Sequence, residues 1–308
     1  MIQIENLRKQ YGKMEALKGL SLEIGKGQVF GFVGPNGAGK STTMLILATL
    51  LEPTSGKAYV GGFDVVKQPR EVRKLIGYMP DFFGVYDNVT ADEYLDFYAS
   101  NYDIPAAERR EIIPKLLELV SLSHKRDAYV DSLSRGMKQR LGLARSLVHN
   151  PEVLILDEPA SGLDPRARIE LREILKELRE MGKTILISSH ILPELAEMCD
   201  VIGVIEGGEM VATGSVEEIN ARMQGQKLLK LRLLDRWDEA ARLLRQMPLL
   251  TSVTREGNTL VAGFTGTDDE QVELLQRLVE AGLPLASFGE AEGNLEEIFL
   301  EITKGVGS

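Results

Sequence analysis

The sequence predicts an α/β fold built on a parallel sheet, followed by a small α+β domain. Two short apolar runs, Val153 to Leu156 and Thr184 to Ser188, flank a charged stretch with helical character, Arg166 to Met181. Strand, helix and strand in this order indicate a parallel sheet with crossover helices. The pattern changes around Gly214 to Gln226, so we place the domain boundary at residue 220.

The first eighty or so residues predict strands around one helix. Residues 2 to 7 and 20 to 24 alternate apolar and polar side chains, as half-buried strands do. Val29 to Val33 is a short apolar run that is typical of a buried strand. Lys40 to Leu51 is apolar, long enough for a helix and followed by turn residues. Lys57 to Val66 is expected to add further sheet.

The middle of the large domain, from about residue 82 to 150, is predicted to be a helical subdomain. Thr90 and Glu93 have the spacing of a capping box, in which each side chain bonds the backbone N–H of the other. We expect breaks between helices near Pro105 and over Ser121 to Ser132.

Residues 1 to 220 are expected to close with strands at Val201 to Ile205 and Met210-Val211, and residues 221 to 308 to form the α+β domain. The second domain is predicted to contain a strand at Lys227 to Leu233, a helix at Trp237 to Met247, a hairpin at Leu250 to Phe264 that turns at Gly257-Asn258, a helix at Asp268 to Ala281 and a last helix at Asn294 to Lys304.

Composition narrows the class of protein. The chain has 308 residues, is 44% hydrophobic and 27% charged, and so has the profile of an ordinary globular protein. Its net charge of −10 argues against a nucleic-acid binder, because such proteins usually carry a basic domain or stripe. The one cysteine, Cys199, allows no intramolecular disulfide, which fits a reducing cytosol. We expect no membrane span, since no uncharged apolar run approaches about 18 residues.

A glycine-rich stretch from Gly34 to Ser41 has the pattern G-x-x-x-x-G-K-S between the predicted buried strand and the first helix. Its glycines let backbone N–H groups turn inward around phosphate oxygens, and the helix directs its positive end at the same anion. In this pattern Lys40 reaches the β- and γ-phosphates of a nucleotide, and the Ser41 hydroxyl ligates Mg²⁺.

A carboxylate pair, Asp157 and Glu158, follows the apolar run that ends at Leu156. An aspartate at the tip of a strand beside a phosphate-binding loop holds Mg²⁺, and the adjacent glutamate is placed to deprotonate an attacking water. Ser134 and Gly136 form a Ser-x-Gly helix start, which suits an anion. Together these features predict phosphoanhydride hydrolysis.

Two further side chains carry weaker signals. His190 follows a predicted strand, at the edge where ligands bind in open α/β sheets. Tyr11 has a ring that can stack on a base, although packing in the core or on the surface is the usual role of a tyrosine. His124 and His149 have no such context, and we expect them on the surface.

The order of these motifs resembles the ATP-binding subunit of an ABC transporter over about residues 1 to 220. Leu133 to Met137 is similar to the family signature L-S-G-G-Q, and the carboxylate pair and Ser-Gly-Leu-Asp at Ser161 to Asp164 follow it. The remainder is similar to the accessory domain of bacterial exporter-type ATPases. The resemblance implies the P-loop NTPase fold of ABC ATPases, with a parallel core sheet, an antiparallel β subdomain, a helical subdomain and a small C-terminal α+β domain.

The resemblance also implies a role for each site residue, with ATP and Mg²⁺ as cofactors. Ser134 and Gly136 contact the ATP that a second subunit holds, so the chain works as a dimer. The nucleotide-binding residues implied are Tyr11, Gly34, Pro35, Asn36, Gly37, Ala38, Gly39, Lys40, Ser41, Thr42, Ser134 and Gly136. The catalytic residues implied are Lys40, Glu158 as the base and His190 as the sensor of the γ-phosphate, and the metal ligands are Ser41 and Asp157, with Asp81 as a candidate.

Two departures from the family pattern bear on these roles. Arg135 stands at a glycine position of the signature, where it either adds a cation near an ATP phosphate or points to solvent. Asp81 follows Tyr78-Met79-Pro80, where the family has a glutamine. Aspartate offers a hard oxygen to Mg²⁺, but it is shorter and cannot donate a hydrogen bond, so its equivalence to the glutamine stays open.

The function expected from the resemblance is an ATP-hydrolysing subunit that energises a separately encoded membrane permease in efflux, from the cytoplasmic face of the membrane. Phe82, Phe83 and Tyr86 either contact that permease or pack within the helical subdomain. The alternative is a soluble ABC ATPase that acts on the ribosome or DNA. Those proteins generally carry two cassettes or long coiled-coil insertions, and this chain has one P-loop and one signature. An importer subunit is disfavoured by the type of C-terminal domain.

Overall fold

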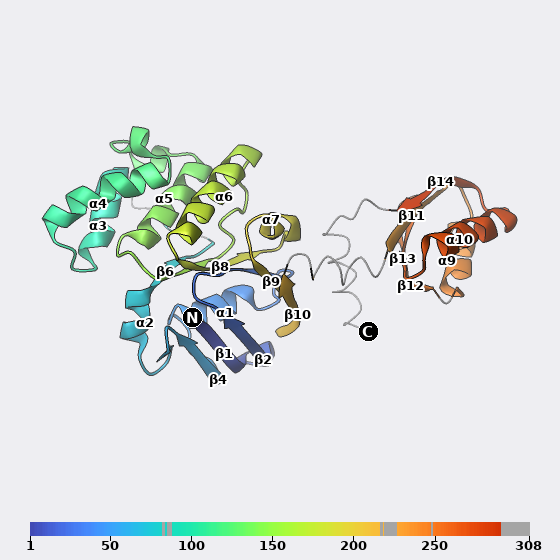
Figure 1. Cartoon of the computed structure of the whole chain (residues 1–308), viewed down its shortest axis with the longest axis horizontal. Coiled ribbons are helices and arrows are strands. Elements are labelled where there is room, and N and C mark those ends of the chain that lie inside the picture. The colour runs from blue at the N-terminus through green and yellow to red at the C-terminus, as the bar shows by residue number, and fades with distance from the viewer. Residues whose placement is uncertain (82–83, 85–87, 216–217, 219–226, 248, 291–308) are drawn as a thin grey trace. The chain divides into compact units, whose positions relative to one another are not determined.

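The computed structural model describes the chain except for residues 82–83, 85–87, 216–217, 219–226, 248 and 291–308 (Figure 1). The chain divides into two compact units, Met1–Val216 and Glu217–Ser308. The predicted boundary at residue 220 falls in an undescribed stretch and stays a prediction. Phe82, Phe83, Tyr86 and the predicted last helix, Asn294 to Lys304, also lie outside the described residues.

A six-stranded sheet with the order β10-β9-β3-β8-β7-β6 forms the centre of the first unit. Its strands are β3 (Val29–Val33), β6 (Ile76–Met79), β7 (Val153–Leu156), β8 (Thr184–Ser189), β9 (Val201–Glu206) and β10 (Glu209–Ser215). All neighbours pair in parallel except β10, which is antiparallel to β9 at one edge. The predicted α/β class with a parallel core sheet is therefore confirmed.

An antiparallel sheet with the order β2-β1-β4-β5 supplies the second layer of this unit. It contains β1 (Ile2–Tyr11), β2 (Met14–Ile24), β4 (Ser55–Val60) and β5 (Phe63–Asp64). Side chains of β1, of β3 and of helix α1 (Lys40–Leu47) share one hydrophobic core, which includes Ile4, Phe32 and Met44. Because α1 starts where β3 delivers the chain, this packing fixes the position of the loop between them.

A group of helices lies at the end of the first unit away from the antiparallel sheet, as the green ribbons of Figure 1 show. The helices of this unit that follow α1 are α2 (Pro69–Leu75), α3 (Ala91–Ser100), α4 (Ala106–Leu119), α5 (Arg135–Leu147), α6 (Pro165–Glu180) and α7 (Leu192–Ala196). The predicted capping box is present at α3: the Thr90 hydroxyl accepts from the Glu93 N–H at 3.3 Å, and Glu93 Oε2 accepts from the Thr90 N–H at 2.8 Å. Among the described residues, no helix is both long and apolar enough to cross a membrane.

The second unit is a β-α-β-β-α-β arrangement with the strand order β12-β13-β11-β14, and every pair is antiparallel. Its elements are β11 (Lys227–Leu233), α9 (Trp237–Arg245), β12 (Leu250–Glu256), β13 (Thr259–Phe264), α10 (Asp268–Glu280) and β14 (Leu285–Glu290). Leu229 and Leu231 of β11 pack with Leu244 of α9 and Leu278 of α10 in its core. The expected α+β class and hairpin are confirmed, and β14 is an additional strand.

His149, which the sequence predicts on the surface, is half-buried in the structure. Its ring stacks on Tyr102, with centroids 3.8 Å apart and planes 4° from parallel, and its Nε2 lies 2.9 Å from the Ile76 carbonyl oxygen. Burial lowers the pKa of His149, because desolvation disfavours the charged imidazolium. His124, in contrast, is exposed as expected.

His149 should make folding stability depend on pH. Its pKa is lower in the folded chain than in the unfolded chain, so proton uptake favours unfolding as the pH falls through about 6.5. A His149→Gln variant can still donate to the Ile76 carbonyl but does not titrate. We expect its urea unfolding midpoint to decline less than that of wild type between about pH 8 and pH 5. His124→Gln is the matched control and should follow wild type; parallel curves for His149→Gln and wild type would contradict the prediction.

Candidate functional site

The loop from Gly34 to Gly39 joins β3 to α1 and forms one wall of the site. Gly39 is the N-cap of α1 and has φ of 109°, which is the left-handed region that favours glycine. A Cβ there would lie 2.7 Å from Leu17 Cδ2 and 2.9 Å from the Ala16 carbonyl oxygen. Glycine is therefore required both by the backbone angle and by the close approach of β2. The helix N-terminus behind it favours an anion in front of the loop.

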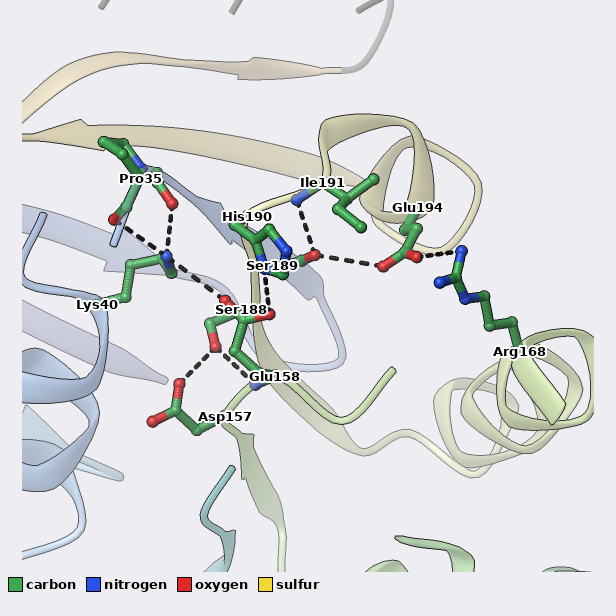
Figure 2. Close-up of polar contacts among 11 residues, drawn as sticks. Pro35, Lys40, Asp157, Glu158, Arg168, Ser188, Ser189, His190, Ile191 and Glu194 are labelled. Carbon is green, nitrogen blue, oxygen red and sulfur yellow. Dashed lines mark hydrogen bonds and ion pairs between the residues drawn. The ribbon is translucent and has the colours of Figure 1, made fainter. Parts of the chain in front are cut away.

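Lys40 is buried between this loop and a carboxylate (Figure 2). Its Nζ donates to the Gly34 carbonyl oxygen at 2.5 Å and to the Pro35 carbonyl oxygen at 3.3 Å. The same Nζ lies 3.5 Å from Glu158 Oε1. The ammonium group is thus aimed at the mouth of the loop, where a phosphate oxygen could replace a carbonyl as its acceptor.

The carboxylates and His190 meet because β7 and β8 are parallel neighbours whose carboxyl ends share one edge of the sheet. Ser188 of β8 contacts both residues of the carboxylate pair: its hydroxyl donates to Asp157 Oδ1 at 2.6 Å and accepts from the Glu158 N–H at 2.9 Å. Glu158 Oε2 lies 2.9 Å from His190 Nδ1. Glu158 has φ of 49°, a strained backbone for a side chain of this size that points to a function at this position.

Ser188 is a site residue that the sequence did not single out. Its signal is a small polar residue at the end of an otherwise apolar strand, T-I-L-I-S-S. Such a residue becomes informative only when the pairing of β7 with β8 is known, because that pairing places it beside Asp157.

A cavity of about 350 Å³ brings most of the predicted residues together. It is lined by Tyr11, Met14, Ala16, Pro35, Asn36, Gly37, Ala38, Gly39, Lys40, Ser41, Thr42, Asp81, Glu158, Ser161 and His190. Tyr11 is 42% exposed at its rim, so the ring is accessible to a ligand. Gly34, Asp157, Ser134 and Gly136 are not among the residues that line the cavity.

Asp81 follows β6 and enters the same cavity. Burial raises the pKa of the Asp81 carboxyl group, and the negative charges of Asp157 and Glu158 raise it further. The three acidic side chains therefore repel one another in a site that a cation would stabilise.

Ser134 and Gly136 lie at the start of α5. The Ser134 side chain is the N-cap of this helix and accepts from the Met137 N–H at 3.3 Å. The Arg135 guanidinium lies against Gly162, since a Cβ on Gly162 would be 2.3 Å from Arg135 Nη1. Arg135 therefore rests on the Ser161 to Asp164 loop of its own chain and remains exposed, which agrees with the alternative in which it points to solvent.

The oxygen donors present fit Mg²⁺ in the way that a nucleotide site requires. No three His, Cys, Asp or Glu side chains of the described residues converge as a metal cage. Mg²⁺ is usually held by one or two carboxylates together with phosphate oxygens and water, so a complete protein cage is not needed. Asp157 at the strand end and Ser41 in the cavity wall are hard donors of this kind.

Comparison with known proteins identifies the family. Residues 17–161 match the family described as ABC transporter. The linearmycin resistance ATP-binding protein LnrL of Bacillus subtilis (strain 168) is 34% identical over 305 residues, which cover 98% of each chain. This chain belongs to the ABC transporter family. The bacitracin transport ATP-binding protein BcrA of Bacillus licheniformis is 35% identical over 308 residues, 99% of this chain and 98% of the relative.

The match extends to both units of this ABC protein. A dimeric post-hydrolysis structure of an ATP-binding cassette with bound ADP and Pi superposes with a TM-score of 0.64 and 27% identity, and covers 70% of this chain and 99% of the other. Residues 214–303 match the family described as the C-terminal domain of DrrA1-3-like ATP-binding proteins. The chain is thus an ATP-binding and ATP-hydrolysing subunit of the ABC family.

Proposed function

We propose that this ABC ATPase energises export through a separately encoded membrane permease, from the cytoplasmic face of the membrane, with Mg²⁺ bound beside ATP. Its relatives named for resistance and transport support this direction, and so does the DrrA-like C-terminal match. The same relatives favour a transporter subunit over an ABC ATPase that acts on the ribosome or DNA.

One observation carries the proposed chemistry: the P-loop, Glu158 and His190 share a cavity that Ser134 and Gly136 do not line. The loop N–H groups and the N-terminus of α1 bind the phosphates, and Tyr11 stacks on the adenine at the rim. When bound, Mg²⁺ supplies positive charge to the phosphate oxygens, and Ser41 and Asp157 are the residues that would hold it. Ser134 and Gly136 then serve the nucleotide of a second subunit.

Glu158 acts as the base once one of its oxygens is released. Both oxygens are engaged, because Oε1 faces Lys40 at 3.5 Å and Oε2 faces His190 at 2.9 Å. A phosphate in the loop competes with the Glu158 carboxylate for the Lys40 ammonium, because the phosphates of a nucleotide carry more negative charge than one carboxylate. Oε1 is then free to take a proton from water, while His190 keeps the carboxylate oriented.

The transporter assignment is tested by purifying the tagged full-length chain from detergent-solubilised membranes of its own cells. We expect an integral membrane protein to copurify. Recovery of ribosomal proteins or DNA in place of a membrane protein would contradict the assignment.

Asp81→Gln tests whether Asp81 takes part in metal binding. Replacing a charged carboxylate oxygen near the metal by a neutral amide oxygen should raise the Mg²⁺ concentration for half-maximal ATPase activity by about tenfold, the lower end of the range for changes around a metal. ATP affinity measured without Mg²⁺ should not weaken, because the P-loop is intact. Asp81→Asn keeps the side-chain length and removes the charge, so comparing it with Asp81→Gln separates the effect of charge from the effect of length. Unchanged Mg²⁺ dependence and turnover in both variants would show that Asp81 is neither a ligand nor a counterpart of the family glutamine.

A further inference from the structure

A chain of polar contacts outside the nucleotide cavity joins the Ser161 to Asp164 loop to the strand end that carries His190. Figure 2 shows its part from Ser189 through Glu194 to Arg168. Ser189 Oγ accepts from the Ile191 N–H at 3.0 Å and donates to Glu194 Oε2 at 3.4 Å. Glu194 Oε1 lies 2.7 Å from Arg168 Nη1. Arg168 Nε in turn donates to the Leu163 carbonyl oxygen at 3.2 Å.

The contacts cross between elements that are otherwise separate in the chain. Arg168 lies on the first turn of α6, directly after the loop, and Glu194 lies on the five-residue helix α7, directly after His190. The Glu194 side chain is only 12% exposed, and burial raises its pKa. The Arg168 side chain is 41% exposed, and an ion pair with an exposed partner contributes little to stability, so stability alone does not explain the Arg168–Glu194 pair.

We propose that Arg168 and Glu194 are positioning residues. They hold the Ser161 to Asp164 loop and His190 at a fixed position relative to each other, so that the loop and His190 move together. This proposal rests on the proposed roles of His190 and of the loop in ATP hydrolysis. Arg168 fixes the loop through the Leu163 carbonyl, and Glu194 fixes the His190 backbone through Ser189. A displacement of the loop by a second subunit then changes the contact between His190 and Glu158.

The structure offers a matched control on the same two segments. Arg172 of α6 forms an ion pair with Glu197, the residue that ends α7. Both pairs border one cavity of about 370 Å³, but among the described residues Arg172 and Glu197 make no hydrogen bond to the loop or to the His190 strand end. The control pair therefore borders the same cavity as Arg168 and Glu194 and lacks their link to the site.

The test compares Glu194→Gln and Arg168→Gln with Glu197→Gln and Arg172→Gln in the full-length chain. The amide of Glu194→Gln carries no charge for the ion pair with Arg168, although its oxygen can still accept from Ser189. We expect kcat for ATP hydrolysis to fall by about tenfold in Glu194→Gln and Arg168→Gln with KM for ATP unchanged, since small misplacements of a catalytic group are costly. The double variant should lose no more than either single one, because the two residues act as one unit. The control variants should keep the wild-type kcat.

Three results would overturn the proposal: a wild-type kcat in Glu194→Gln, a loss confined to KM, or an equal loss in the control pair. Thermal unfolding of all variants checks the fold, and Arg168→Lys, which keeps the charge and loses the Nε bond to Leu163, replaces any variant that does not fold. Wild type and Glu158→Gln measured in parallel report on the proposed function itself. If wild type hydrolyses ATP and Glu158→Gln does not, the base assignment stands whatever Glu194→Gln shows.

Discussion

Glu158→Gln is expected to lower kcat for ATP hydrolysis by about 10²- to 10⁴-fold, which is the usual contribution of a general base, while ATP binding is retained. Glutamine keeps the length of the side chain, and its carbonyl oxygen can still accept from Lys40 or His190, so the cavity keeps its shape. It has no carboxylate to take a proton from water. Because ATP binding and hydrolysis are then uncoupled, the variant should accumulate as an ATP-bound dimer.

Steady-state ATPase assays, nucleotide binding and light scattering with ATP measure these three quantities for Glu158→Gln. Glu152→Gln is the matched control, because Glu152 directly precedes the other end of β7 and pairs with Lys26 on the surface at 3.2 Å. The control should retain wild-type turnover. Wild-type turnover in Glu158→Gln would instead exclude Glu158 as the base.

The site residues that the sequence predicted are those marked by residue type and spacing within one short segment of the chain. The P-loop is one contiguous segment, and Asp157 and Glu158 directly follow an apolar strand, so residue type and spacing were sufficient. The contacts of Ser188 and of the Arg168–Glu194 pair were missed because they arise from the adjacency of β7 with β8 and of α6 with α7. The position of Arg135 against Gly162 depends likewise on packing between distant segments.

The same distinction applies to the fold. The capping box at Thr90 and the hairpin around Gly257 were predicted from short patterns, and both are present. Strand β6 was missed because it has four residues and contains Gly77, which disfavours a strand. A Cβ on Gly77 would lie 2.1 Å from the Ser146 carbonyl oxygen, so the glycine allows close packing against α5 that no local pattern reveals.

Lys40→Ala is expected to weaken ATP binding by about 10- to 100-fold, because a hydrogen bond to a charged group contributes about 1.5–3 kcal/mol. The loss follows from the position of Nζ at the mouth of the loop, 2.5 Å from the Gly34 carbonyl and 3.5 Å from Glu158 Oε1. Titration with a fluorescent ATP analogue measures the affinity. Lys74→Ala, at an exposed position on α2, should bind as wild type does. Unchanged affinity in Lys40→Ala would argue against the P-loop assignment.

Mixing Lys40→Ala with Ser134→Ala chains extends this prediction to the division of the site between two subunits. Each variant alone damages both sites of a homodimer. In a mixed dimer, the intact P-loop of the Ser134→Ala chain faces the intact Ser134 of the Lys40→Ala chain, so one site is complete. We therefore expect the mixture to hydrolyse ATP faster than either variant alone. Loss of the N-cap in Ser134→Ala costs about 1 kcal/mol of helix stability, so its fold is checked by thermal unfolding. A mixture no more active than its components would mean that Lys40 and Ser134 serve the same site within one chain.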